Sequence, residues 1–301
     1  MDTSPNALIR LHHFLPRIAS LLVGIALVAI GHPAHCLGQA PSTPGTRAAS
    51  AVYPLDGVVD ADKSVWIVDR NVPGVWKWSD GKLELAIEGE KKFRQRLNAA
   101  RCLAISPSGE LVIGDPATRE IYRRGSDGSL APSVSGWIGI PMDLAFASDG
   151  TLYIADVERR VVWKQANKDE KPTVFAEVNP RGLFVDAKDR LWVVSQDASQ
   201  LLRLSSDGTK EVLVKERTFE FPHQVVVDSQ GTAWVTDGYK KGLWRIAEGQ
   251  PPELVFSGEP LQNPVGIFLF EDRPVIVDPH AQGVFKWDDG KLQLWFKLEK
   301  K

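Results

Sequence analysis

The residues of this chain that are best suited to chemistry occupy equivalent positions in six similar apolar segments. Five of these segments begin with a proline, and one begins with Ala100. The two positions that follow hold, in chain order, Leu55-Asp56, Arg101-Cys102, Met142-Asp143, Arg181-Gly182, His223-Gln224 and Val265-Gly266. Arginine pairs well with carboxylates, whereas histidine and aspartate can also bind metal ions. The pattern therefore predicts an anion site or a metal site that draws its residues from several segments.

A repeat of about forty residues positions these segments. Its clearest mark is an apolar five-residue phrase that ends, in the six repeats, at Asp69, Asp115, Asp156, Ser195, Asp237 and Asp278. These ends lie 46, 41, 39, 42 and 41 residues apart. Turn residues and apolar residues around each phrase mark three further short strands. Six units of four antiparallel strands predict an all-β, six-bladed β-propeller, which we expect over residues 51–299.

One repeat in particular resembles a known family. The stretch from Pro180 to Asp186 (PRGLFVD), followed by Leu191 to Val194 (LWVV), is similar to the NHL repeat. The resemblance extends over about residues 52–298 and implies a six-bladed NHL-type propeller. That fold belongs to the same broad group as gluconolactonase-like, strictosidine-synthase-like and peptidylamidoglycolate-lyase-like propellers. Because these relatives bind, hydrolyse or eliminate with different residues, the resemblance predicts a fold and not an activity.

The topology of a propeller brings the six segments together. The first strand of each blade lines the central channel, and its start shares one face of the ring with the end of the second strand. We therefore expect a ligand-binding channel mouth formed by Asp56, Arg101, Asp143, Arg181, His223 and Gln224. Its arginines favour contact with an anionic or carboxylate-bearing ligand, or with a partner peptide.

A metal site is the alternative for the same positions. The resemblance to gluconolactonase-like propellers would imply a divalent ion held by one Glu, two Asn and one Asp, but these positions offer no Asn and no Glu. The lyase-like propellers use several histidines on zinc, whereas here only His223 matches that phrase. His223 with His280 and Asp143 could complete a set of three protein ligands for Ca²⁺ or Zn²⁺. No catalytic residue is assigned.

The other recurrent residues have structural explanations. An Asp at the end of a strand can accept backbone N–H bonds in the following turn, which explains its presence in five of the six phrases. The aromatic residues of the second strands share a register that fills the space between blades. Cys102 is interpreted as a buried structural thiol rather than a nucleophile activated by Arg101. The chain offers no spare strand to join the last blade to the first, so we expect the ring to close by side-chain packing.

The N-terminal residues predict export. Arg10 and Arg17 precede an apolar stretch over residues 18–30, which is shorter than the roughly 20 residues that span a bilayer. Residues 1–36 are therefore interpreted as a signal peptide, with cleavage after residue 36 or 40, and residues 37–50 as a flexible linker. The mature protein is expected in the periplasm or outside the cell, without a stable membrane span. An uncleaved N-terminal membrane anchor is the alternative.

The overall charge restricts the partners. The formal net charge of −2 over 301 residues provides no basic field for nucleic acid. The sequence therefore favours an exported binding module for a small anionic ligand or a protein or peptide partner, rather than an enzyme. The alternative is a metal-assisted hydrolase or lyase acting on a small lactone, sugar acid or amide-like substrate.

Overall fold

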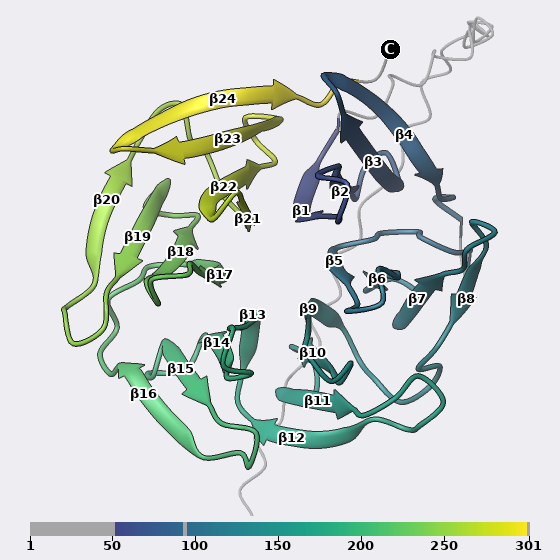
Figure 1. Cartoon of the computed structure of the whole chain (residues 1–301), viewed down its shortest axis with the longest axis horizontal. Coiled ribbons are helices and arrows are strands. Elements are labelled where there is room, and N and C mark those ends of the chain that lie inside the picture. Colours follow the sequence, from purple (N-terminus) through teal and green to yellow (C-terminus); the bar gives the residue numbers. More distant parts are fainter. Residues whose placement is uncertain (1–51, 93–94, 300–301) are drawn as a thin grey trace, which may run out of the picture. The chain divides into compact units, whose positions relative to one another are not determined.

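The computed structural model describes residues 52–92 and 95–299, which form a six-bladed β-propeller (Figure 1). Each blade is a four-stranded antiparallel sheet whose strands follow chain order from the channel to the rim. The predicted all-β fold of six four-stranded blades is therefore confirmed. The predicted signal peptide (1–36) and linker (37–50) lie outside the described residues, and export stays a prediction. No helix in the described part of the chain is long and apolar enough to cross a membrane.

The strands have the following bounds. Blades one to three are β1 (Pro54–Val59), β2 (Val65–Asp69), β3 (Gly74–Ser79) and β4 (Lys82–Glu88); β5 (Cys102–Ile105), β6 (Leu111–Asp115), β7 (Glu120–Arg124) and β8 (Leu130–Pro132); and β9 (Pro141–Phe146), β10 (Leu152–Asp156), β11 (Val161–Gln165) and β12 (Thr173–Glu177). Blades four to six are β13 (Pro180–Val185), β14 (Leu191–Ser195), β15 (Leu201–Leu204) and β16 (Lys210–Val214); β17 (Pro222–Val227), β18 (Ala233–Asp237), β19 (Gly242–Ile246) and β20 (Glu253–Ser257); and β21 (Gly266–Phe270), β22 (Arg273–Asp278), β23 (Gly283–Asp288) and β24 (Lys291–Lys297).

Buried acids at the ends of the second strands hold each blade to the loop in front of it. Asp156, at the end of β10, accepts backbone N–H bonds from Gly139 (2.6 Å) and Ile140 (3.1 Å), which precede β9. It also accepts the N–H groups of Glu158 and Arg159 in the following turn. The same arrangement recurs at Asp69, Asp115, Asp237 and Asp278. The predicted role of these acids as turn acceptors is confirmed, and it extends to the start of the inner strand.

Blade four has Ser195 in place of the acid, and a neighbouring residue restores the missing bond. Ser195 Oγ accepts the backbone N–H of Asp197 at 3.0 Å. The Asp197 carboxylate in turn accepts the N–H of Asn179, which precedes β13, at 3.0 Å. The start of the inner strand is therefore held by a carboxylate in all six blades.

Apolar clusters fill each of the six junctions between neighbouring blades. One cluster contains Met142 and Tyr153 of blade three with Leu183 and Val193 of blade four, and the other five junctions are packed in the same way. The aromatic residues of the second strands belong to these clusters, as the shared register predicted. Burial of apolar surface between blades therefore stabilises every junction of the ring.

The ring closes by side-chain packing. The sheet of blade one contains only β1 to β4, and that of blade six contains only β21 to β24. The cluster between them joins Val65 and Ile67 of β2 to Phe268 of β21 and Val275 of β22. This is the closure that the sequence predicted.

Phe268→Ala tests the contribution of this closing junction. Phe268 is 4% exposed, and removing a buried phenylalanine side chain costs about 3–5 kcal/mol. We expect the free energy of unfolding, measured by chemical denaturation, to fall by about that amount. Leu294→Ala on β24 is the control, because Leu294 is 48% exposed. A change of similar size in both variants would contradict closure through this cluster.

Candidate functional site

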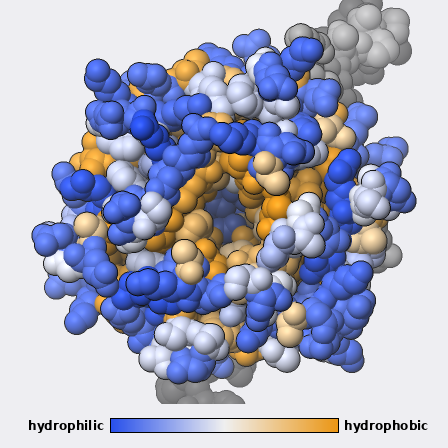
Figure 2. Space-filling view, in the orientation of Figure 1, coloured by the Kyte–Doolittle hydropathy of each residue, from blue (hydrophilic) through white to orange (hydrophobic). Residues whose placement is uncertain are grey.

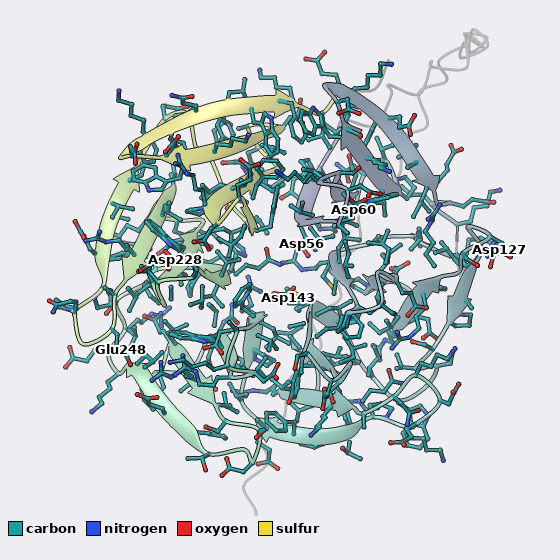
Figure 3. All side chains as sticks on the ribbon, viewed as in Figure 1. Asp56, Asp60, Asp127, Asp143, Asp228 and Glu248 are labelled. Carbon is teal, nitrogen blue, oxygen red and sulfur yellow. The ribbon has the colours of Figure 1, made fainter. Side chains whose placement is uncertain are left out.

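The starts of the inner strands surround a pocket with a volume of about 830 Å³. Its lining includes the first residue of each pair described above: Leu55, Arg101, Met142, Arg181, His223 and Val265. The second residues of those pairs do not line the pocket. Figure 3 shows two of them, Asp56 and Asp143, near the centre of the ring. The structure therefore divides the predicted site into a pocket set (Arg101, Arg181, His223) and a central set (Asp56, Asp143, Gln224).

The central set ties neighbouring inner strands together. Asp56 accepts the N–H of Gly57 and, across the junction to blade two, that of Leu103, both at 2.8 Å. Asp143 makes the same pair of bonds, to Leu144 at 2.9 Å and to Leu183 of blade four at 2.7 Å.

Gln224 supplies the third tie. Its Oε1 accepts the N–H of Ile267 in blade six at 3.0 Å. The blades are thus linked at the channel as pairs one–two, three–four and five–six. All four carboxylate oxygens of Asp56 and Asp143 are used in backbone bonds.

Small residues alternate with the central set because the inner strands approach closely. A Cβ atom on Gly182 would lie 2.5 Å from Cα of Gln224, and one on Gly266 would lie 2.6 Å from the carbonyl oxygen of Leu55. A side chain at either position would force the strands apart. The third small residue, Cys102, is fully buried, and burial raises the pKa of its thiol well above the ordinary value. The prediction of a buried thiol is confirmed.

The two central acids resist ionisation. Burial raises the pKa of Asp56 to about 6, although the bonds from Leu103, Gln224 and Gly57 oppose this shift. Burial, followed by the charge of Asp56, raises the pKa of Asp143 well above its ordinary value. The negative charges of the two acids favour the protonated form of Arg101, but burial outweighs them and lowers the pKa of Arg101.

The two pocket arginines lack partners for part of their guanidinium groups. Burial lowers the pKa of Arg101, and burial and the charge of Arg101 lower the pKa of Arg181 to about 10. Both side chains stay protonated at neutral pH. Their buried Nε atoms have no hydrogen-bond partner among residues 52–92 and 95–299. Each guanidinium therefore has a donor available for an acceptor.

His223 lies beside these arginines as a neutral imidazole. It is 6% exposed, and neither ring nitrogen has a hydrogen-bond partner within the described chain. Burial, then the charges of Arg181 and Arg101, lower its pKa well below the ordinary value. The Phe221 ring holds the group in place, since it packs edge-on against His223 at 4.9 Å and carries the Arg181 guanidinium at 4.5 Å.

The pocket wall is positive. Arg70 and Lys241 join Arg101 and Arg181 in its lining, and no described Asp or Glu lines it. The charge of Arg70 acts on Arg101, because it contributes to the lowered pKa of Arg101. An anion in the pocket would relieve this repulsion.

Aromatic side chains stand at the mouth of the pocket. Tyr239 is 70% exposed and stacks on Phe221, with ring centroids 4.7 Å apart. Tyr53 Oη and His280 Nε2 lie 3.3 Å apart, within hydrogen-bond distance.

The residues considered for a metal site are not brought together. His280 pairs with Tyr53, the oxygens of Asp143 accept backbone N–H groups, and His223 lies among arginines. Within residues 52–92 and 95–299, no group of three or more His, Cys, Asp or Glu side chains is arranged to hold a metal ion.

Several pocket residues were not found from the sequence. Arg70, Tyr239 and Lys241 lie in the turns after the second strands, and Asn263 lies just before an inner strand. The available signal was that these turns share a face with the inner-strand starts, and that their residues differ between repeats.

Comparison with known proteins places the fold and leaves the activity open. No protein-family model and no curated protein matches the chain. Similar solved structures include virginiamycin B lyase from Staphylococcus aureus, with a TM-score of 0.62 and 15% identity over 83% of this chain and 85% of that one. A structure of a nidogen/laminin complex matches with a TM-score of 0.61 and 15% identity over 80% and 90% of the two chains. A gluconolactonase from Xanthomonas campestris matches with a TM-score of 0.60 and 17% identity over 82% and 86%. The NHL-type propeller resemblance is thus borne out as a fold.

Asp56→Asn tests the raised pKa at the centre of the ring. The pKa of Asp56 rises on folding from 3.8 to about 6. Protonation of Asp56 therefore favours the folded state, and this stabilisation is lost as the pH rises through about 6. Asparagine cannot titrate and loses one acceptor, so it destabilises the fold. We expect the deficit in unfolding free energy to be larger at pH 4 than at pH 7.

Asp127→Asn is the control for this pH dependence. The bonds from Ser129 lower the pKa of Asp127, so its contribution to stability is present at high pH and lost as the pH falls. Its deficit should therefore not shrink between pH 4 and pH 7. An Asp56→Asn deficit that is constant over this range would show that burial does not raise the pKa of Asp56.

Proposed function

We propose that this propeller is a binding protein for a small organic anion, which it holds at the channel mouth through Arg101, Arg181 and His223. The observation that carries the proposal is the gathering of unpaired buried nitrogens. Four of the six buried side-chain nitrogen or oxygen atoms without a partner in the described chain belong to these three residues: Arg101 Nε, Arg181 Nε, and Nδ1 and Nε2 of His223. A buried polar atom without a partner destabilises a protein by about 1–3 kcal/mol, so their concentration in one pocket indicates a ligand that completes them.

The charge of the pocket selects an anion. Two guanidinium groups with lowered pKa values repel each other across the pocket. A carboxylate placed between them would accept charge-assisted hydrogen bonds from both. The neutral His223 would add one donor and one acceptor, which discriminate among anions by their other polar groups.

The size of the pocket favours a small molecule over a protein partner. A volume of about 830 Å³ lies within the range of roughly 300–1,000 Å³ that is usual for small-molecule sites. The structural neighbours include a lyase, a gluconolactonase and nidogen in complex with laminin. Propellers of this shape thus serve catalysis and protein binding alike, and the fold supports neither over the other. The unpaired groups of the pocket are what favour anion binding.

Arg181→Gln tests this function. The probes are acetate, succinate and 2-naphthoate, with 2-naphthamide as the neutral analogue, titrated by calorimetry. We expect the protein to bind at least one carboxylate with a Kd below about 1 mM and the amide much more weakly. Glutamine lacks the charge of arginine, so the Kd of that carboxylate should rise roughly 10- to 100-fold.

Arg245→Gln is the matched control. Arg245 lies on β19, is exposed, and pairs with Glu253 at 2.7 Å, so its loss should leave the Kd unchanged. The proposal would be overturned if none of the carboxylates bound, or if the two variants behaved alike. Binding that required added Ca²⁺ or Zn²⁺ would replace direct recognition by arginine with the metal-assisted alternative.

A further inference from the structure

The pocket has an apolar side and a basic side. Around the ring, the pocket residues at the starts of the inner strands are Val265 and Leu55 in blades six and one. In blades two, four and five they are Arg101, Arg181 and His223. Blades six and one are neighbours, because the ring closes between them. Leu55 and Val265 therefore occupy one arc of the channel mouth, and Arg101, Arg181 and His223 lie on the remaining arc, where Met142 of blade three separates the two arginines.

The side chains of Leu55 and Val265 carry no hydrogen-bonding groups for a ligand. Leu55 and Val265 are buried in one shared cluster and both line the pocket. Polar residues of the same two blades, namely Tyr53, Arg70, Gln262, Asn263 and His280, also belong to the pocket lining around this apolar contact. Figure 2 shows hydrophobic residues around the central opening of the ring. Above this arc, the Tyr53–His280 pair forms an aromatic rim, with ring centroids 5.8 Å apart.

Two further cations, Lys241 and Arg70, line the pocket. Lys241 follows the second strand of blade five. Arg70 is carried by blade one, but its charge acts on Arg101 of blade two. Met142 of blade three lies between the two arginines in ring order and continues the apolar surface beneath a bound anion.

From this division we propose that the ligand is an amphipathic carboxylate that lies across the channel mouth. Its carboxylate binds Arg101 and Arg181, and its apolar body covers Leu55 and Val265 beneath the Tyr53–His280 pair. A polyhydroxylated anion of the same size is disfavoured, because hydroxyl groups placed on Leu55 and Val265 would lose their hydrogen bonds to water without replacement. Acetate would leave most of the pocket unfilled. This inference rests on the proposed anion-binding function.

The experiment compares three carboxylates that differ only in what the carboxylate carries: acetate, gluconate and 2-naphthoate. We expect 2-naphthoate to bind at least about tenfold more tightly than gluconate, because burial of its rings adds a hydrophobic contribution. Leu55→Ala and Val265→Ala should each weaken 2-naphthoate roughly tenfold and leave acetate within about twofold. Arg101→Gln should weaken both ligands by the same factor, since it removes only the shared contact.

The informative quantity is the ratio of the Kd of 2-naphthoate to the Kd of acetate within one variant. Partial unfolding of a variant changes both Kd values together and leaves this ratio unchanged. Leu294→Ala, on the outer strand β24, is the control and should leave the ratio unchanged. Gluconate binding more tightly than 2-naphthoate, or a ratio unaffected by both Leu55→Ala and Val265→Ala, would overturn the amphipathic ligand while leaving anion binding intact. Failure of all three carboxylates to bind would overturn the proposed function itself.

Discussion

The carboxylate at or just after the end of each second strand, buried in five of the six blades, makes the interaction on which the arrangement of the channel mouth depends. A buried carboxylate is stable only when hydrogen-bond donors replace the water that it has lost. Here the donors are backbone N–H groups of the loop before the first strand and of the turn after the second strand. Both segments are thereby held to one point. The six inner strands consequently begin at equivalent points, and the residues just after those points meet in one pocket. The blade determines where a site lies, and the residues that differ between blades determine what it binds.

Adjacent residues at the start of an inner strand have different structural roles, because successive side chains point to opposite faces of a strand. The first position faces the pocket and varies from apolar to basic. The second position lies at the centre of the ring. There Asp56 and Asp143 accept hydrogen bonds from the backbone N–H groups of Leu103 and Leu183 in the neighbouring blades. Each such tie needs a partner strand that comes close, and Gly182 and Gly266 provide that approach. Polar and small residues therefore alternate around a ring whose outer repeat is sixfold.

The fold could be predicted from the sequence because the pattern of one blade occurs six times. Each apolar phrase, turn and aromatic position recurs at the same spacing, so an error in one blade is corrected by the others. The pocket residues Arg101, Arg181 and His223 could be predicted for the opposite reason, since they break the repeat at a position that the fold directs into the channel.

Other contacts of the site could not be predicted, because no sequence pattern indicates them. The hydrogen bond from the Leu103 N–H to Asp56 joins residues whose proximity depends on how blades one and two pack, and spacing along the chain does not encode it. Tyr239 and Lys241 lie in a turn without strand register, so their orientation could not be inferred. The pairing of His280 with Tyr53 likewise joins residues of the last and first blades.

The way the ring closes makes chain order irrelevant to its shape. Every sheet is complete within one stretch of sequence, and Val52 and Leu298, near the two ends of the described propeller, pack into the same apolar cluster. The seam between the ends is therefore chemically equivalent to the five junctions within the chain. If a short linker joined those ends and the backbone were opened in any loop between blades, all six sheets and all six clusters would be preserved. The folded ring therefore does not depend on which blade comes first in the chain, and a circularly permuted chain specifies the same fold.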